Sequence, residues 1–265
     1  MVHKITALLP PGHPWGQRII HFDTVDSTNT YAKKIAADGA PNGTVIIADA
    51  QTGGRGRLGR SFSSPAGLGL YLSVILRPQC PPDALMHLTC AAGVAASDAV
   101  QTSAGITPGI KWTNDLVIGR RKLGGILTEL SIDPATKLVD YAVIGIGINC
   151  KQQENDFPPE IRDIATSLFL SGGEPDRVAL AAALIHELYQ MNEMLLTQKA
   201  QVMAVFTQRC VTLGKKISIV RGEQVLHAKA LAVDEDGGLV VAFPDGSHTT
   251  VSSGEVSIRG MYGYL

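Results

Sequence analysis

The sequence predicts an α/β (α+β) protein, in which a mixed β-sheet with flanking helices is followed by a small C-terminal β-barrel. As far as about residue 213, apolar β-branched runs of strand length alternate with longer stretches rich in alanine and leucine. Beyond Gly214 the chain changes to short apolar runs separated by Arg-Gly, Asp-Gly and Pro-Asp-Gly turns. We therefore predict two domains, residues 1–213 and residues 214–265.

The first part of the chain combines predicted strands with two helices. Strands are expected at residues 18–25, 44–51 and 67–76, which are rich in β-branched and apolar side chains. The stretch after the first strand is expected to be a helix, with Asp26 or Ser27 as its N-cap and Gly39 just past its end. A long alanine-rich helix is predicted over residues 82–102.

The remainder of the larger domain is expected to hold more strands and one more long helix. Strands are predicted at residues 109–119, 121–132 and 139–150. The helix is predicted at about residues 175–198, where apolar residues recur at the spacing of one buried face: Ala181, Leu184, Ile185, Leu188 and Leu195.

Composition limits the class of protein. A chain of 265 residues with 45% hydrophobic and 18% charged residues is an ordinary globular protein. A formal net charge of −1 gives no overall attraction to nucleic acid or anionic membranes, so we expect neither as a partner. The sequence contains no run of about 18 apolar residues and no signal-peptide pattern, so a cytoplasmic location is expected. The dispersed cysteines Cys80, Cys90, Cys150 and Cys210 predict unpaired thiols and no metal cluster.

Residues 53–60 concentrate four glycines and three arginines without any acidic residue. Glycines are costly to order, and a solvated loop gains nothing from four of them. Backbone N–H groups and guanidinium groups together suit an anion. The stretch nearly matches the phosphate-loop pattern, but Arg60 stands in place of the lysine, and a strand follows where a helix is required. We predict an anion-binding loop of another design, with a plain solvated loop as the alternative.

Two later stretches, KWTND (111–115) and RKLGGILTEL (121–130), place polar and glycine residues on neighbouring strands. We expect them to form a hairpin joined near Gly119, with glycines after Lys122 that allow a ligand to approach the backbone. An edge strand whose lysines deter aggregation would explain Lys122, but it would leave Asn114 and Asp115 unexplained. The stretch GIGIN (145–149) is either a tightly packed strand or a flat floor under a ligand, with Asn149 at its rim.

Taken together and in order, the motifs DSTN, QTGGRGRLGR, KWTND, RKLGGIL and GIGIN resemble those of biotin protein ligases over about residues 18–150. The β-rich tail corresponds to the SH3-like C-terminal barrel of that family. The resemblance implies a ligase that uses biotin, ATP and Mg²⁺. Such an enzyme first forms biotinoyl-5′-AMP and pyrophosphate, and then transfers biotin to a lysine of a biotin carboxyl carrier domain, expected to belong to acetyl-CoA carboxylase.

The resemblance also implies roles for individual residues. The catalytic cations would be Lys122, Arg57 and Lys111. The biotin-binding residues would be Ser27, Thr28, Asn29, Gln51, Arg55, Gly56, Arg57 and Lys122. The nucleotide-binding residues would be Arg60, Phe62, Asn114, Asn149 and Arg259. The sequence does not identify the Mg²⁺ ligands. Thr113 replaces the proline that the family usually has in the KWTND motif, and the N–H that it restores is expected to shift the local backbone slightly.

Several alternatives stay open at this point. A lipoate or octanoate ligase or transferase shares the fold, although the arginine-rich loop and its two partner motifs match biotin enzymes better. A biotin-sensing regulator would carry a DNA-binding domain, whereas about 20 residues precede the first predicted strand and the chain is not basic. A biotin-binding module without activity would not need the lysines and arginines of the motifs. A homodimer is compatible with the sequence.

Overall fold

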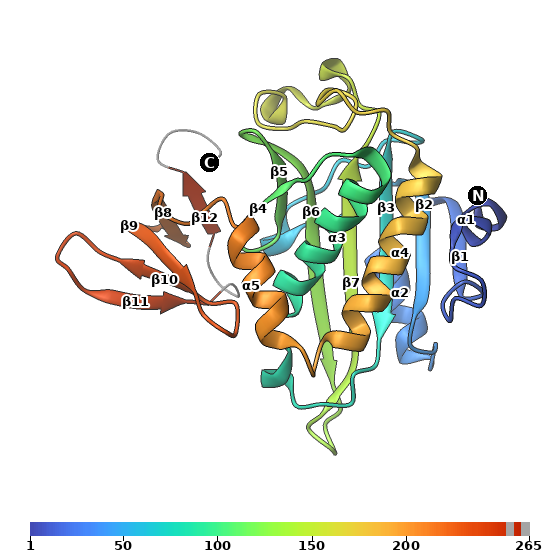
Figure 1. The fold of residues 1–265 in the computed structure, drawn as a ribbon, viewed down its shortest axis with the longest axis horizontal. Helices are drawn as coiled ribbons and strands as arrows, with labels where there is room; N and C mark the ends of the chain where they lie inside the picture. Colours follow the sequence, from blue (N-terminus) through green and yellow to red (C-terminus); the bar gives the residue numbers. More distant parts are fainter. Residues whose placement is uncertain (253–256, 261–265) are drawn as a thin grey trace.

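A computed structural model describes residues 1–252 and 257–260, and among these residues the strands form two sheets (Figure 1). The large sheet has the order β1-β2-β3-β7-β6-β5-β4. Its strands are β1 (Ile19–Val25), β2 (Thr44–Gln51), β3 (Gly69–Leu76), β4 (Gly109–Lys111), β5 (Asp115–Ile118), β6 (Arg121–Ile132) and β7 (Val139–Asn149). The pair β1 and β2 is parallel and the other neighbours are antiparallel, which confirms the predicted mixed sheet.

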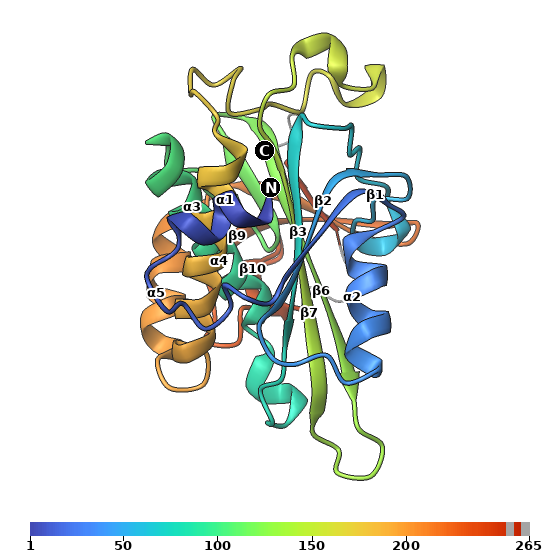
Figure 2. The same cartoon turned by 90° about the vertical axis from the view of Figure 1, so that its right-hand side faces the viewer.

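Helices cover both faces of the large sheet. They are α1 (Val2–Leu8), α2 (Thr28–Ala37), α3 (Leu88–Ala104), α4 (Arg177–Met194) and α5 (Lys199–Arg209). Figure 2 shows α2 alone on one face and α1, α3, α4 and α5 together on the other. Because helices pack on both of its faces, β3 is buried along its whole length. The part of the chain that the structure describes holds no helix with both the length and the apolar character needed to cross a bilayer.

Local sequence explains how α2 is placed against the sheet. Ser27 is its N-cap, accepting a hydrogen bond from the Thr30 backbone N–H at 3.4 Å, so one of the two predicted caps is confirmed. Ala32 and Ala36, one helical turn apart, are buried against the sheet. The chain leaves the helix at Gly39, which adopts the left-handed φ of +92°. The N-terminus of α2 lies at the end of β2, where the Thr28 backbone N–H donates to Gln51 Oε1 at 2.8 Å.

Four details of the predicted elements differ from the structure. The predicted helix 82–102 begins with a separate 3-10 turn at Pro82–Leu85, and α3 starts only at Leu88. The predicted strand 109–119 is split into β4 and β5 by residues 112–114. The helices α1 and α5 were not predicted. In α5 the buried residues Val202, Met203 and Phe206 have helical spacing, but the rest of the segment is polar enough to hide the pattern.

The C-terminal sheet is antiparallel, with the order β11-β10-β9-β8-β12 among the described residues. Its strands are β8 (Lys216–Arg221), β9 (Gln224–Val233), β10 (Leu239–Ala242), β11 (His248–Val251) and β12 (Ser257–Gly260). The predicted β-rich tail is therefore confirmed. The sheet is attached to the larger unit through Trp112, whose indole N–H donates to the Gly237 carbonyl at 2.8 Å and whose backbone N–H donates to Thr212 Oγ1 at 2.9 Å.

Candidate functional site

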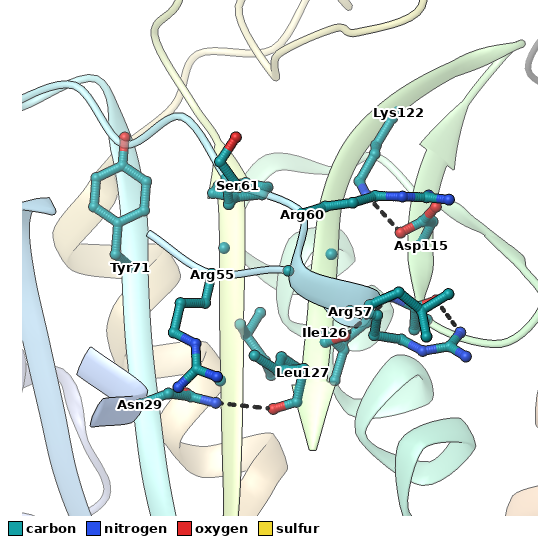
Figure 3. A pocket seen from close by; sticks show the side chains of 18 of the residues that line it. Asn29, Arg55, Arg57, Arg60, Ser61, Tyr71, Asp115, Lys122, Ile126 and Leu127 are labelled. Atoms are coloured by element: carbon teal, nitrogen blue, oxygen red, sulfur yellow. Dashed lines mark hydrogen bonds and ion pairs between the residues drawn. The ribbon is translucent and has the colours of Figure 1, made fainter. Parts of the chain in front are cut away.

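A cavity of about 430 Å³ lies between the start of α2, the loop after β2, the β4–β5 connection and the strands β6 and β7. Its volume suits a small organic ligand. Twelve of the residues that the sequence singled out line it: Ser27, Thr28, Asn29, Gln51, Arg55, Gly56, Arg57, Arg60, Phe62, Lys111, Asn114 and Lys122. Figure 3 shows several of these side chains around the cavity. The motifs are thus brought together from segments far apart in the chain.

One end of the cavity is a set of neutral hydrogen-bonding groups. Gln51 Oε1 accepts from the backbone N–H of Thr28 at 2.8 Å and from its hydroxyl at 3.1 Å. The Gln51 amide in turn donates to Ser64 Oγ at 2.8 Å. Ser27 caps the helix beside them and also lines the cavity. Because each group is fixed by another, this polar end holds its geometry without a ligand.

Asn29 is almost completely enclosed at the polar end, with 3% of its surface exposed. Its Oδ1 accepts from the Ser73 hydroxyl at 2.6 Å, and its amide donates to the Leu127 carbonyl at 3.3 Å and to Glu129 Oε2 at 3.0 Å. A Cβ at Gly145 would lie 2.0 Å from Asn29 Oδ1. Only glycine at this position of β7 leaves room for the Asn29 side chain.

The other end of the cavity is cationic. Lys122 Nζ lies 2.6 Å from Asp115 Oδ1, and Arg57 donates to Asn114 Oδ1 at 3.0 Å (Figure 3). Lys111 lines the same region and is buried. Burial lowers the pKa of the Arg57 guanidinium, although the charge of Asp115 opposes this change. An arginine keeps its charge at neutral pH even so, which leaves cations at a partly desolvated site where they attract anions strongly.

The β4–β5 connection carries the departure from the family motif. The peptide bond between Trp112 and Thr113 is cis, and the buried Thr113 hydroxyl lies 3.4 Å from Cys90 Sγ. Asn114 is held against β6, since its carbonyl accepts from the Ile126 N–H at 2.8 Å and its amide donates to the Ile126 carbonyl at 3.1 Å. The side chains next to Thr113 therefore still reach the cavity.

The glycine–arginine loop, residues 53–62, folds back on itself over the cavity. Arg55 and Ser61 form an antiparallel bridge, and the Phe62 N–H donates to the Gly54 carbonyl at 2.9 Å. A Cβ at Gly54 would lie 2.3 Å from the Phe62 carbonyl oxygen, so this close approach requires glycine. The turn passes through Leu58, which has a φ of 55°. The predicted loop is thus present and covers a cavity with cationic groups.

The alternating glycines of β7 accommodate side chains of the site. Gly145 makes room for Asn29, as described above, and a Cβ at Gly147 would lie 2.6 Å from the Phe62 ring. Both glycines also line the cavity. Gly145 thus allows the tight strand–helix packing that was one interpretation of the GIGIN motif, and the position of both glycines at the cavity is compatible with the other interpretation, a floor under a ligand, which stays a prediction.

Two predicted nucleotide-binding residues are not placed at the cavity by the described structure. Asn149 is not among the described lining residues; it is buried, donating to the Thr166 carbonyl at 2.9 Å and accepting from Gln152 at 3.2 Å. Arg259 lies in β12, where its backbone pairs with Ser218, and its side chain is outside what the structure describes. The roles of both residues stay predictions.

Sequence reasoning missed Ser73 and Glu129, and it singled out Asp115 without giving it a role; the structure connects all three to the site. Ser73 could have been found as the single polar residue in an apolar strand, because such a residue needs a buried partner. Glu129 follows Gly125 and Leu127 at a period of two, which places it on the same face of β6 as these two lining residues.

Comparison with known proteins agrees with this arrangement. A family model described as the biotin/lipoate A/B protein ligase family matches residues 21–149, and the biotin protein ligase C-terminal domain model matches residues 212–259. The bifunctional ligase/repressor BirA of Bacillus subtilis is 35% identical over 235 residues, covering 87% of this chain and 71% of that protein. The biotin–[acetyl-CoA-carboxylase] ligase of Mycobacterium tuberculosis is 33% identical over 256 residues, covering 94% and 91%.

A solved structure extends the likeness to three dimensions. The biotin protein ligase from Aquifex aeolicus in complex with biotin and ATP is 30% identical and has a TM-score of 0.77, covering 92% of this chain and 99% of that chain. Both family models, the relatives and the fold point the same way. The chain belongs to the biotin protein ligase family.

Proposed function

We propose that the protein activates biotin with ATP and transfers it to a lysine of a biotin carboxyl carrier domain. The observation that supports this proposal is the division of one cavity into a neutral hydrogen-bonding end and a cationic end. Biotin has the matching division, with a ureido ring at one end and a carboxylate at the other. The names of the relatives suggest acetyl-CoA carboxylase as the source of the carrier domain.

At the polar end, the ureido ring would meet Ser27, Thr28 and Gln51, which the structure fixes in place. The apolar part of biotin would lie on lining residues of β6, among them Ile126 and Leu127. These groups keep hydrogen-bonding capacity beyond their protein contacts, such as the second amide N–H of Gln51, and a ring without hydrogen-bonding groups, such as that of lipoate, would leave that capacity unused. Sites built to pair a polar group reject analogues that lack it by about 10⁴-fold or more. The site therefore favours biotin over lipoate, the substrate of the alternative enzymes with the same fold.

At the cationic end, the carboxylate of biotin and the α-phosphate of ATP would have to approach each other. Two like charges about 4 Å apart repel by about 4 kcal/mol at an effective dielectric constant of about 20. The cations Lys122, Arg57 and Lys111 would offset this repulsion and stabilise charge that develops on the phosphoryl group. Because they are held in place before substrate binds, little reorganisation is needed in the transition state.

The reaction would proceed in two steps. A carboxylate oxygen of biotin attacks the α-phosphorus, the bond from that phosphorus to the oxygen bridging to the β-phosphate breaks, and pyrophosphate leaves. The amine of the carrier lysine then attacks the carbonyl carbon of the mixed anhydride, loses a proton, and expels AMP. The loop over the cavity would shield the anhydride from water between the steps.

The donor set also suits the Mg²⁺ that accompanies ATP. Magnesium prefers oxygen ligands, and among the described lining residues Asp115 has a second carboxylate oxygen besides the one paired with Lys122, whereas the Asn114 amide oxygen already accepts from Arg57. When bound, the ion would neutralise part of the charge on the phosphates. The remaining ligands would come from the nucleotide and water.

The test is to incubate the protein with Mg-ATP, a carrier domain, and either biotin or lipoate. We expect AMP and pyrophosphate as products and an increase in the mass of the carrier equal to one biotin. Formation of ADP and phosphate would contradict the adenylation step. Preferential attachment of lipoate would assign the chain to the alternative activity.

A further inference from the structure

Glu129 lies just outside the cavity and contacts residues from two other segments, the helix α2 and the glycine–arginine loop. It lies on β6, and its side chain is 23% exposed. Its Oε1 is 2.6 Å from Lys33 Nζ on α2 and 3.8 Å from Arg55 on the glycine–arginine loop. Its Oε2 accepts from the Asn29 amide at 3.0 Å. A single carboxylate therefore connects the sheet, the helix and the loop.

From Glu129 a continuous series of polar contacts runs under the polar end of the cavity. The Ser73 hydroxyl, which is fully buried, donates to Asn29 Oδ1 and lies 2.8 Å from Thr28 Oγ1. At the far end, Ser64 donates to the Phe62 carbonyl at 3.0 Å. In order, the series passes through Glu129, Asn29, Ser73, Thr28, Gln51, Ser64 and the carbonyl of Phe62.

Both ends of this series contact the glycine–arginine loop. Arg55, at the Glu129 end, belongs to one limb of the loop, and Phe62 belongs to the other. Figure 3 shows the Arg55 side chain pointing from the loop toward Asn29. The bridge between Arg55 and Ser61 closes the circuit. The position of the loop and the geometry of the polar end are therefore set by one connected network.

The charge of Glu129 is suited to this position. Burial alone would raise the pKa of its carboxyl, but hydrogen bonds from Lys33 and Asn29 and the charges of Lys33 and Arg55 hold that pKa below its ordinary value. The ionised form offers two acceptor oxygens, so it can hold Asn29 and Lys33 at once and still attract Arg55. A neutral amide has one acceptor oxygen, and the two donors would compete for it.

We infer that Glu129 is a positioning residue, which fixes Asn29 at the polar end of the cavity and draws Arg55 of the loop over it. The part of this inference that concerns biotin rests on the proposed function. The contacts of Glu129 with Asn29, Lys33 and Arg55 place it at the polar end of the cavity and the loop. Its removal should therefore weaken biotin binding while leaving the chemical step nearly intact.

The experiment compares Glu129→Gln with two control variants. Asp140→Asn removes a carboxylate that pairs with Arg77 at 2.8 Å, on the same sheet but away from the cavity. Lys33→Met breaks an ion pair of Glu129 but leaves its contacts with Asn29 and Arg55. All three variants are first checked for folding by circular dichroism and thermal unfolding.

The first measurement is steady-state kinetics with biotin and Mg-ATP. For Glu129→Gln we expect the KM for biotin to rise about tenfold, which corresponds to the loss of the free energy of one hydrogen bond to a charged group. The kcat and the KM for ATP should stay within about twofold of the unaltered protein, because the cationic end is unchanged. Both controls should keep the KM for biotin. If Lys33→Met raises it as much as Glu129→Gln does, loss of the ion pair explains the effect and positioning is refuted.

The second measurement needs no ligand. Trypsin can cut after Arg55, Arg57 and Arg60, so the rate of cleavage in this loop reports how often the loop opens. Loss of an exposed ion pair should raise the rate in Glu129→Gln by up to about fivefold, with no change in Asp140→Asn. Unchanged cleavage and unchanged KM in Glu129→Gln would overturn the inference and leave the proposed function standing. Faster cleavage in a protein that does not use biotin would refute the proposed function and support the role of Glu129 in holding the loop.

Discussion

Replacing Gly145 with alanine tests the packing of the polar end directly. The added methyl carbon would lie 2.0 Å from Asn29 Oδ1, whereas a carbon–oxygen contact needs about 3.3 Å. Asn29 would have to move, and it is held by Ser73 at 2.6 Å and by Glu129 at 3.0 Å. Asn29 and Ser73 are buried, so water has little access to the hydrogen bond that the movement breaks between them.

The magnitude follows from these broken hydrogen bonds. Each buried hydrogen bond contributes about 1 kcal/mol, and a buried group left without a partner costs about 1–3 kcal/mol. We therefore expect Gly145→Ala to lower the free energy of unfolding by about 3 kcal/mol and to weaken biotin binding at least about tenfold. Urea denaturation and isothermal titration with biotin measure the two quantities.

Gly93→Ala in α3 is the matched control. A Cβ at Gly93 would lie 3.5 Å from Ile110 Cδ1, an ordinary contact, and alanine favours the helix over glycine by up to about 1 kcal/mol. This variant should be as stable as the unaltered protein or more so, and it should bind biotin equally well. Wild-type stability and biotin affinity in Gly145→Ala would refute the role assigned to the glycine.

The other predictions concern charged residues of the site. Lys122→Arg should fold but lose most of its rate of pyrophosphate release at saturating biotin and Mg-ATP, because a wide planar group replaces a compact ammonium 2.6 Å from Asp115. Lys122→Met should lose more, and near-normal turnover in that folded variant would remove Lys122 from the catalytic residues. Arg57→Gly should retain biotinoyl-AMP poorly and so label unrelated lysines, which a streptavidin blot of a protein mixture detects; unaltered selectivity would contradict a clamping role. For Glu129, the folded-state pKa lies below its ordinary value of 4.5, so its contribution to stability is complete at neutral pH and is lost as the pH falls through the folded pKa. The difference in unfolding free energy between the unaltered protein and Glu129→Gln should therefore shrink in acid, and a difference that stays constant across a pH series would be evidence against this linkage.

The motifs of the sequence pointed to most of the polar residues that line the cavity because each motif carries its own local signal. A cap residue such as Ser27 and a glycine-rich loop at 53–60 can be recognised within a few residues of sequence. The apolar run of β3 is equally clear, since a strand covered on both faces has no polar face. These signals do not depend on how distant segments meet.

The features that were missed depend on long-range register. Glu129 contacts Asn29 across 100 positions of the sequence, and this contact exists only because Leu127 pairs with Gly145 in the β6–β7 ladder. No pattern in the residues around Glu129 predicts a partner so distant in the sequence. The split between β4 and β5 was missed for a related reason. The apolar pattern of β4 continues into Trp112, but the indole N–H of Trp112 is hydrogen-bonded to the Gly237 carbonyl, next to the C-terminal sheet.

Trp112 gives the cavity a wall that is shared between the two units. One part of the residue lines the cavity, while its indole N–H is bound to the Gly237 carbonyl of the C-terminal sheet and only 4% of its surface is exposed. A chain cut at residue 213 would leave that N–H without its acceptor and the wall without support. The two units are therefore expected to melt in a single transition, and a C-terminal unit transplanted from a relative would have to reproduce the Gly237 turn to sustain the activity of the other.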